Sequence, residues 1–282
     1  MIEYNQPLYR PPAEANSVII QATLGCSFNK CTFCTMYESK EFIIRPLKDV
    51  FLDIDKMASF YSDANKMFLA DGDALALDTN HLVKILEYAY SKFSKLRRVS
   101  VYASAFNLHD KSLEELYLLK EKGLTLIYYG IESGSFEVLK RIQKPISNKK
   151  MCEGLNKAYD AGMKISVTVI LGVAGKKYSN LHIEETAKIL NQIKITYLST
   201  LQLMLEAHTK ERFIKNFDGE FELLSTKEML EEQKYFLELL NPINKVIFRS
   251  NHASNSLALA GTLPKDKNRL VDEVNYVIEN YL

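Results

Sequence analysis

The sequence predicts an α/β fold in which parallel strands alternate with helices. Apolar, strand-like runs recur six times between residues 17 and 205, and each is followed by a stretch whose apolar residues are spaced at three and four. Such alternation favours parallel strands joined by right-handed crossovers. A length of 282 residues suits an α/β barrel built as one unit. We expect a partial (β/α)6 barrel of the TIM type, with a C-terminal helical and loop extension that caps the barrel mouth.

The strands and helices can be placed in order along the chain. The first strand is expected in SVIIQATLG, which is rich in β-branched residues and ends in Gly25. Pro46 suits a first helical position, and Gly123 and Gly162 are typical of helix ends. Later strands are expected in KMFLA, RRVSVYASAF, LTLIYYGIE, MKISVTVILG and TYLSTLQLML. Helices are expected in the ranges 46–61, 79–96, 110–122, 136–143, 148–161, 179–193, 227–240 and 265–281.

These elements divide the chain into an N-terminal lead (1–16), the barrel core (17–205) and an extension packed on it (206–282).

Lys and Arg number 36 against 35 Asp and Glu, a net charge of +1, so the charge does not indicate a nucleic acid or a membrane as partner. The N-terminus lacks a signal pattern, and no window approaches the run of about 18 apolar residues that spans a bilayer. We expect a cytoplasmic protein.

Three of the four cysteines lie within nine positions, at Cys26, Cys31 and Cys34. Structural zinc normally takes four protein ligands, and no histidine lies in this loop. Three thiolates are better suited to an iron–sulfur cluster with one open iron. The alternatives are a zinc site completed by a distant residue, or cysteines that only pack in the core. Cys152 stands alone in a predicted helix and is interpreted as a buried small hydrophobe.

Polar and glycine residues follow several of the predicted strands. The cysteine loop follows the first strand, Asp71-Gly72-Asp73 the second, Ser104 the third, Glu132 the fourth and Gly172 the fifth. Functional groups of parallel α/β folds gather at the carboxyl ends of the strands. We therefore expect these residues to share one face.

Four segments carry a resemblance to a known family. GCSFNKCTFC, with Phe33 before the last cysteine, resembles the cluster loop of radical S-adenosylmethionine (SAM) enzymes, and LADGDAL resembles their motif after the second strand. YYGIESGSFEVLKRIQKPIS and VILGVAGKKYSNLHIEETAKIL are similar to the branch that holds the Elongator catalytic subunit and MiaB-like, NifB-like and HemN-like proteins. One departure stands out, because four residues separate Cys26 from Cys31, whereas the commonest pattern of the superfamily has three.

The resemblance implies a [4Fe–4S] cluster on the three cysteines and SAM on its open iron. The residues implied to bind SAM are Phe33, Ala70, Asp71, Gly72, Asp73, Ser104, Glu132, Arg141, Leu171 and Gly172. For several of these candidate residues the alternative to SAM binding is a structural role. Asp71 and Asp73 would then be turn or capping residues, and Ser104 would only hydrogen-bond the backbone. Phe33 would pack within the loop, and Arg141 would lie on a solvated helix face.

The implied reaction is reductive cleavage of SAM to a 5′-deoxyadenosyl radical, which abstracts hydrogen from a small or medium organic substrate. The implied electron donor is a reduced flavodoxin or a ferredoxin-type protein. The cysteine spacing leaves open an atypical cleavage of SAM or a methyl transfer, and a non-catalytic zinc or iron–sulfur-binding interaction protein is the other alternative. His252 as a proton donor and Tyr37 as a radical quencher are the candidate catalytic side chains.

Overall fold

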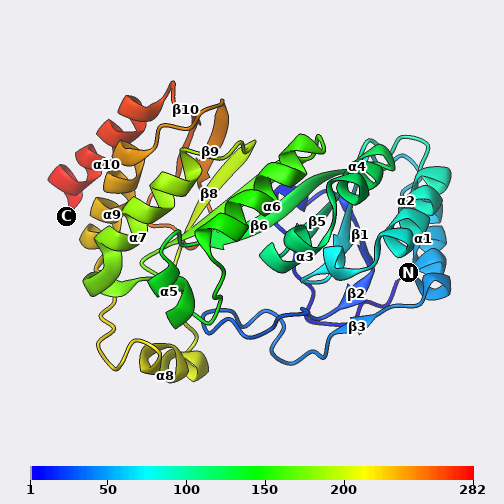
Figure 1. Ribbon diagram of the computed structural model, residues 1–282, viewed down its shortest axis with the longest axis horizontal. Coiled ribbons are helices and arrows are strands. Elements are labelled where there is room, and N and C mark those ends of the chain that lie inside the picture. The colour runs from blue at the N-terminus through cyan, green and yellow to red at the C-terminus, as the bar shows by residue number, and fades with distance from the viewer. Residues whose placement is uncertain (1) are drawn as a thin grey trace. The chain divides into compact units, whose positions relative to one another are not determined.

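The computed structural model describes residues 2–282, which fold into two compact units (Figure 1). Unit 1 holds the residues up to Asn29 together with Met36–Tyr129 and Lys157–Ile165. Unit 2 holds Lys30–Thr35, Gly130–Asn156 and Ser166–Leu282. Strands β6 and β7 and helix α6 contribute residues to both units.

Unit 1 is built on parallel strands. β1 pairs with β4, where Val18 lies opposite Met67, and β4 pairs with β5, where Lys66 lies opposite Arg98. The pairing of β5 with β6 is also parallel. The strands and helices of this unit are η1 (Pro12–Glu14), β1 (Val18–Gln21), β2 (Thr23–Leu24), β3 (Ile43–Ile44), α1 (Leu47–Phe60), β4 (Lys66–Ala70), η2 (Ala74–Ala76), α2 (Thr79–Lys92), β5 (Arg98–Ala103), α3 (Ala105–Asp110), α4 (Leu113–Glu121) and the start of β6 (Leu124–Glu132).

Unit 2 continues the same alternation and ends in an antiparallel pair. β7 pairs with β8 and β8 with β9 in parallel, whereas β10 runs antiparallel to β9. The remaining strands and helices are α5 (Phe136–Arg141), α6 (Asn148–Asp160), β7 (Lys164–Leu171), α7 (Gly175–Leu190), β8 (Tyr197–Gln202), α8 (Ala207–Lys215), α9 (Thr226–Leu239), β9 (Val246–Ser250), β10 (Leu259–Leu263) and α10 (Lys267–Tyr281). Within this unit α10 packs against α9 and against β10 (Figure 1).

Eight strands form one sheet in the order β1-β4-β5-β6-β7-β8-β9-β10, and β2 and β3 form a separate antiparallel pair in unit 1. The sheet and the helices bury apolar residues at the spacing that the sequence shows. In α2, for example, Leu82, Ile85 and Leu86 are fully buried, which is the i, i+3, i+4 stripe of a helix packed on one face. In unit 1, Tyr4 and Leu8 of the N-terminal lead pack against a buried cluster of Ile19, Phe68 and Ala70.

The predicted α/β class with parallel strands is confirmed, and the differences are local. Helix α3 was not expected. Its six residues follow β5 almost directly, and its N-cap, Ser104, was expected only as a polar residue after the strand. Helix α2 begins at Thr79, as expected, and its N-cap is Asp78, whose carboxylate accepts the N–H of His81. Helix α7 begins at Gly175, earlier than expected, and β10 was not expected. The division into a lead, a core and an extension stays a prediction.

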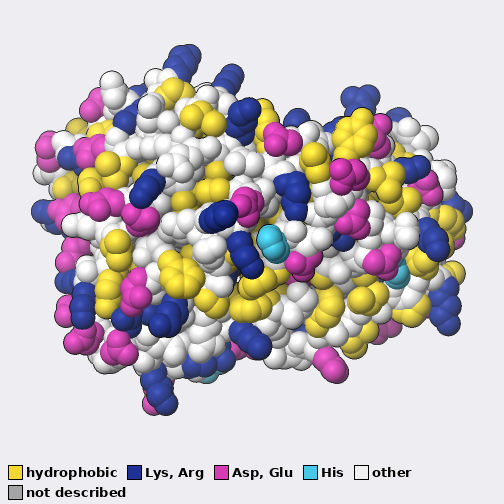
Figure 2. All heavy atoms as spheres, viewed as in Figure 1, with side chains coloured by type: hydrophobic (Ala, Val, Ile, Leu, Met, Phe, Trp, Pro, Cys, Tyr) yellow, Lys and Arg dark blue, Asp and Glu magenta, His cyan; other side chains and the backbone are white. Residues whose placement is uncertain are grey.

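Charges of both signs are interspersed on the face of the molecule that Figure 2 shows. This agrees with the balanced composition, which carries a net charge of +1. Among residues 2–282, none of the helices has the length and apolar character needed to cross a membrane.

Candidate functional site

The cysteine loop begins where the first strands of unit 1 end. Gly25, which precedes Cys26, has a φ of 70°, and a Cβ there would lie 2.8 Å from the carbonyl oxygen of Glu41. All three cysteines are partly buried; Cys26 belongs to unit 1, and Cys31 and Cys34 belong to unit 2. Within residues 2–282, no group of three or more His, Cys, Asp or Glu side chains is gathered as a metal site.

The cysteine loop packs on the end of β4. A Cβ built on Gly72 would lie 3.1 Å from the Cβ of Cys26 and 2.6 Å from the ring of Tyr37, so only glycine fits there without a shift. The Gly72 N–H donates to the carbonyl of Gly25 at 3.0 Å. The structure therefore brings Cys26 together with the 70–73 motif, as the sequence predicted for the carboxyl ends of neighbouring strands.

The spacer residues that follow Cys26 and belong to unit 1 each make a side-chain contact within that unit. The Ser27 hydroxyl donates to Asp73, and the Phe28 ring stacks on Phe106 of α3 with centroids 5.5 Å apart. Asn29 has a φ of 42°, and its side-chain amide donates to the carbonyl of Tyr37 at 2.9 Å. Asparagine tolerates this left-handed conformation better than most residues. Three of the four spacer residues are therefore held by side-chain contacts within unit 1.

The two aspartates after β4 have different surroundings. Asp71 is fully buried and forms an ion pair with Lys40, with 2.7 Å between Nζ and Oδ2. Asp73 is 1% exposed and accepts hydrogen bonds from Ser27 and from the side-chain amide of Asn107. The neighbouring Lys40 was not singled out from the sequence, because nothing local distinguishes it from a surface lysine.

Ser104 caps a helix, and Tyr37 is buried. The Ser104 hydroxyl accepts the N–H of Asn107 at 3.2 Å at the start of α3, which is the backbone role that the sequence left open. Burial, reinforced by the nearby Asp71 charge, raises the pKa of the Tyr37 hydroxyl. A contact of Ser104 with SAM and a redox role of Tyr37 stay predictions.

In unit 2 the carboxylate at the end of β6 is held by a lysine. Glu132 has a φ of 60° and is 8% exposed. Its Oε1 lies 2.8 Å from Nζ of Lys144, which also donates to the carbonyl of Gly130 at 2.7 Å. Lys144 was not among the residues that the sequence pattern identified, so this partner was missed.

The Ser133-Gly134 pair that follows Glu132 is fixed on α7. The Gly134 N–H donates to the Thr186 hydroxyl at 2.7 Å, and the Ser133 hydroxyl lies 2.8 Å from Nδ1 of His182. His182 is completely buried, and loss of hydration lowers its pKa to about 4, so the ring is neutral near pH 7.

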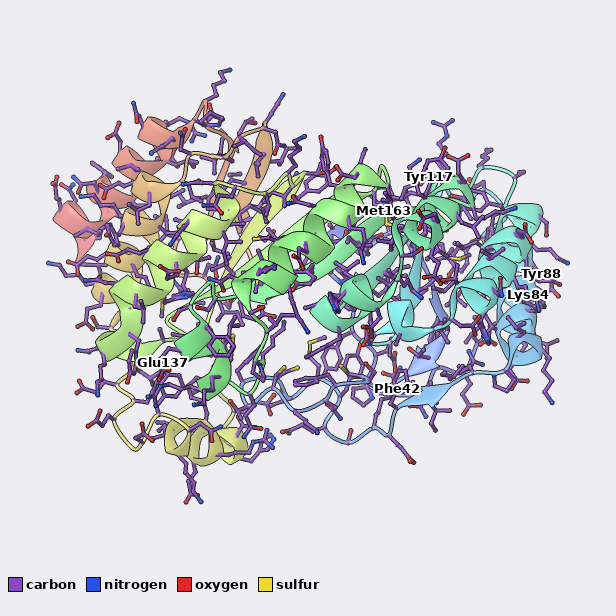
Figure 3. The ribbon with its side chains drawn as sticks, in the orientation of Figure 1. Phe42, Lys84, Tyr88, Tyr117, Glu137 and Met163 are labelled. Carbon is purple, nitrogen blue, oxygen red and sulfur yellow. The ribbon has the colours of Figure 1, made fainter. Side chains whose placement is uncertain are left out.

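Arg141 is engaged by side chains of its own unit. It forms ion pairs with Glu137, which Figure 3 labels on α5, and with Asp218. Its guanidinium also lies 4.8 Å from the ring centroid of Tyr178. The pKa of Arg141 is raised, chiefly by the hydrogen bond to Asp218. The contact of Arg141 with SAM that the family resemblance implies would therefore compete with these partners.

The end of β7 is held by helix α9. Gly172 has a φ of 75°, and its N–H donates to the Glu232 carboxylate at 2.6 Å. A Cβ on Gly172 would lie 2.5 Å from Cε of Met229. Leu171 is 1% exposed. Glu232 is 60 residues away in the sequence, so no local pattern connects it with this strand.

Two further candidates are placed in unit 2. Phe33 is partly buried, and the N–H of its neighbour Thr32 donates to the carbonyl of Ile142 at 3.1 Å. Nδ1 of His252 accepts the N–H of Ser254 at 3.1 Å, so this ring nitrogen serves a local turn. The Asn255 side chain in the same turn binds the backbone of Thr200 and Gln202 in β8. The turn that holds His252 and Asn255 therefore lies on the carboxyl end of β8.

Comparisons with known proteins agree with this arrangement. The family described as the radical SAM superfamily matches residues 20–190. The heme chaperone HemW of Bacillus subtilis is 22% identical over 148 residues, which cover 52% of this chain and 38% of HemW. The structure of HemN, a coproporphyrinogen III oxidase from Escherichia coli, matches with a TM-score of 0.58 at 16% identity, over 79% of this chain and 52% of HemN.

A second solved structure has a related fold. The radical SAM methyltransferase TsrM from Kitasatospora setae, described with cobalamin and a [4Fe–4S] cluster bound, matches with a TM-score of 0.54 at 15% identity, over 66% of this chain and 36% of TsrM. The chain thus spans about half or less of the length of these three proteins. The likenesses to HemN and TsrM show the fold and confirm the predicted partial-barrel class.

The superfamily match covers more than half of the chain and includes the cysteine loop, the β4 motif and the ends of β6 and β7. Members of the superfamily use a [4Fe–4S] cluster and SAM. These cofactors suit a loop that offers three thiolates. The chain belongs to the radical SAM superfamily.

Proposed function

We propose that this protein cleaves SAM reductively and uses the resulting 5′-deoxyadenosyl radical to abstract hydrogen from a small or medium organic substrate. The observation that carries the proposal is the packing of Cys26 on Gly72, which joins the cluster loop to the β4 motif within one unit. A bound [4Fe–4S] cluster would supply the electron and the open iron that chelates SAM.

The chain's own residues would ligate, orient and shield these groups. Cys26, Cys31 and Cys34 would hold the cluster. Gly72 lies beside Cys26, and Asp73 accepts a hydrogen bond from the neighbouring Ser27. Asp73 and the backbone of Ala70 and Gly72 would receive the methionine end of SAM.

The residues of unit 2 would bind the rest of the cofactor. Glu132 would accept a hydrogen bond from the ammonium or a ribose hydroxyl, as ionised carboxylates do strongly. Leu171, Gly172 and Phe33 would contact the adenine. A reduced flavodoxin or ferredoxin-type protein would deliver the electron.

The test is anaerobic reconstitution with iron and sulfide, reduction with dithionite, and mass spectrometry of the products from SAM. We expect 5′-deoxyadenosine from the wild-type protein and none from Cys34→Ala. Cys152→Ala is the matched control, because Cys152 lies on α6, away in sequence from the loop, and it should keep wild-type iron and product.

Other products would point to the alternatives. A methylated product, or another SAM fragment in place of 5′-deoxyadenosine, would support atypical cleavage or methyl transfer. Stoichiometric zinc, no iron after anaerobic purification and no SAM-derived product would support a non-catalytic metal-binding protein and contradict the proposal.

A further inference from the structure

Both ends of the cysteine loop contact one carboxylate. Asp71 Oδ2 accepts the N–H of Gly25, directly before Cys26, at 3.0 Å, and it accepts Nζ of Lys40, beyond Cys34, at 2.7 Å. The other oxygen, Oδ1, accepts the side-chain amide of Gln21 at 2.9 Å. Asp71 is 0% exposed, so both of its oxygens are already used inside unit 1.

Lys40 is nearly as well buried as its partner. Its side chain is 4% exposed, and its ammonium also donates to the carbonyl of Asn5 at 2.7 Å. A buried ion pair adds little stability compared with apolar packing, but loss of one partner leaves an uncompensated buried charge. Such a pair is therefore better suited to fixing the path of the chain than to adding stability.

The four-residue spacer between Cys26 and Cys31 is hydrogen-bonded to the segment that follows Cys34. The Asn29 side chain donates to the carbonyl of Tyr37 at 2.9 Å and to that of Lys40 at 3.4 Å. Asn29 is itself exposed and takes its left-handed φ of 42° within the four-residue spacer. The residues before, within and after the loop are thus linked through Lys40 and Asp71.

We propose that Asp71 and Lys40 are positioning residues that set the geometry of the cluster ligands, and that Asp71 does not contact SAM. The inference rests on the proposed function, because it takes the three cysteines as the cluster ligands. It assigns to Asp71 a role different from the cofactor contact that the family resemblance implies.

The experiment compares reconstituted wild-type protein with Asp71→Asn, Lys40→Met and Asn29→Gly. Lys92→Met is the matched control, since it removes the half-exposed pair of Lys92 with Asp55 on the helices α1 and α2. Iron and sulfide per chain are measured after desalting, the reduced cluster is examined by electron paramagnetic resonance without SAM, and the KM for SAM is measured on the loaded fraction.

We expect Asp71→Asn and Lys40→Met to retain iron about 10-fold less well, as is usual for residues that orient metal ligands. Their resonance spectra should differ from the wild type before SAM is added, while the KM for SAM stays within about three-fold on the loaded fraction, because the cofactor contacts remain. Asn29→Gly accommodates the left-handed φ and should fold normally, with a smaller loss of iron. The Lys92→Met control should match the wild type.

Two results would overturn the inference. The first is Asp71→Asn with full iron, an unchanged spectrum and a KM for SAM raised about 10-fold, which would make Asp71 a SAM ligand. The second is wild-type iron retention in both Lys40→Met and Asn29→Gly. If the wild type holds iron but forms no 5′-deoxyadenosine, the proposed reaction fails, whereas the comparison of iron retention still decides the role of Asp71.

Discussion

The Glu232 carboxylate accepts the backbone N–H of Gly172 at 2.6 Å and a hydrogen bond from the Ser179 hydroxyl. Glu232 is 4% exposed, and loss of hydration raises its pKa to about 7 from the ordinary 4.5. Between these pH values the folded protein binds more protons than the unfolded chain, so its stability falls as the pH rises through this window. The loss amounts to on the order of 3 kcal/mol once the pH exceeds 7.

Glu232→Gln should remove this pH dependence, because the amide is neutral throughout and still accepts a hydrogen bond. We expect the variant to gain stability relative to the wild type as the pH rises from 5 to 8, measured by urea unfolding at each pH. Glu231→Gln, an exposed neighbour on the same helix, is the control. Parallel curves for the wild type and Glu232→Gln would contradict this assignment.

Gly172→Ala should destabilise the protein more than Gly219→Ala. Both glycines have a left-handed φ, 75° and 77°, which costs alanine about 1–2 kcal/mol. A Cβ at Gly219 meets nothing within 4 Å, whereas one at Gly172 lies 2.5 Å from Met229. Urea unfolding of both variants separates backbone strain from crowding, and equal losses would show that Met229 moves aside freely.

Lys144→Met should lower the stability of the protein, because it removes the ion-pair partner of Glu132. The pair has side chains only 16% and 10% exposed, and removal of the lysine leaves the Glu132 carboxylate with less compensation, at a cost on the order of 2 kcal/mol. Lys149→Met removes an exposed pair with Glu153 and should change stability by less than about 0.5 kcal/mol. The measurement is thermal unfolding, and similar melting temperatures for the two variants would refute the prediction.

Thr186→Val should destabilise unit 2, because it leaves the N–H of Gly134 without its hydroxyl acceptor. An unsatisfied buried donor costs about 1–3 kcal/mol. Thr186→Ser keeps the hydroxyl and should recover most of this loss, which chemical denaturation can measure. If the serine variant is as unstable as the valine variant, the lost methyl packing matters more than the hydrogen bond.

Regular elements were predictable from the sequence because their signals are local. The buried stripe of α2 and the apolar run of β7 lie within single windows of sequence. The six-residue α3 was missed because so short a helix gives no clear periodicity, and its Ser104 cap directly follows a strand.

Partners distant in sequence could not be predicted in this way. Lys40 and Asp71 are 31 residues apart, and Gly172 and Glu232 are 60 apart. The sequence identifies Asp71 and Gly172 because they directly follow strands. Their partners become visible only when packing brings another segment against them.

Strand β10 is the last strand of the sheet, and such edges can recruit strands from other chains. Here α10 and the turn before it supply partners for the outward backbone groups. Arg269 donates to the carbonyl of Ala260 at 2.9 Å, and the N–H of Thr262 donates to the Asp266 carboxylate at 2.7 Å. The Thr262 carbonyl accepts the N–H of Asp266 at 2.8 Å. At these positions the chain itself already binds the outward backbone groups of β10, which protects this edge strand against edge-to-edge aggregation.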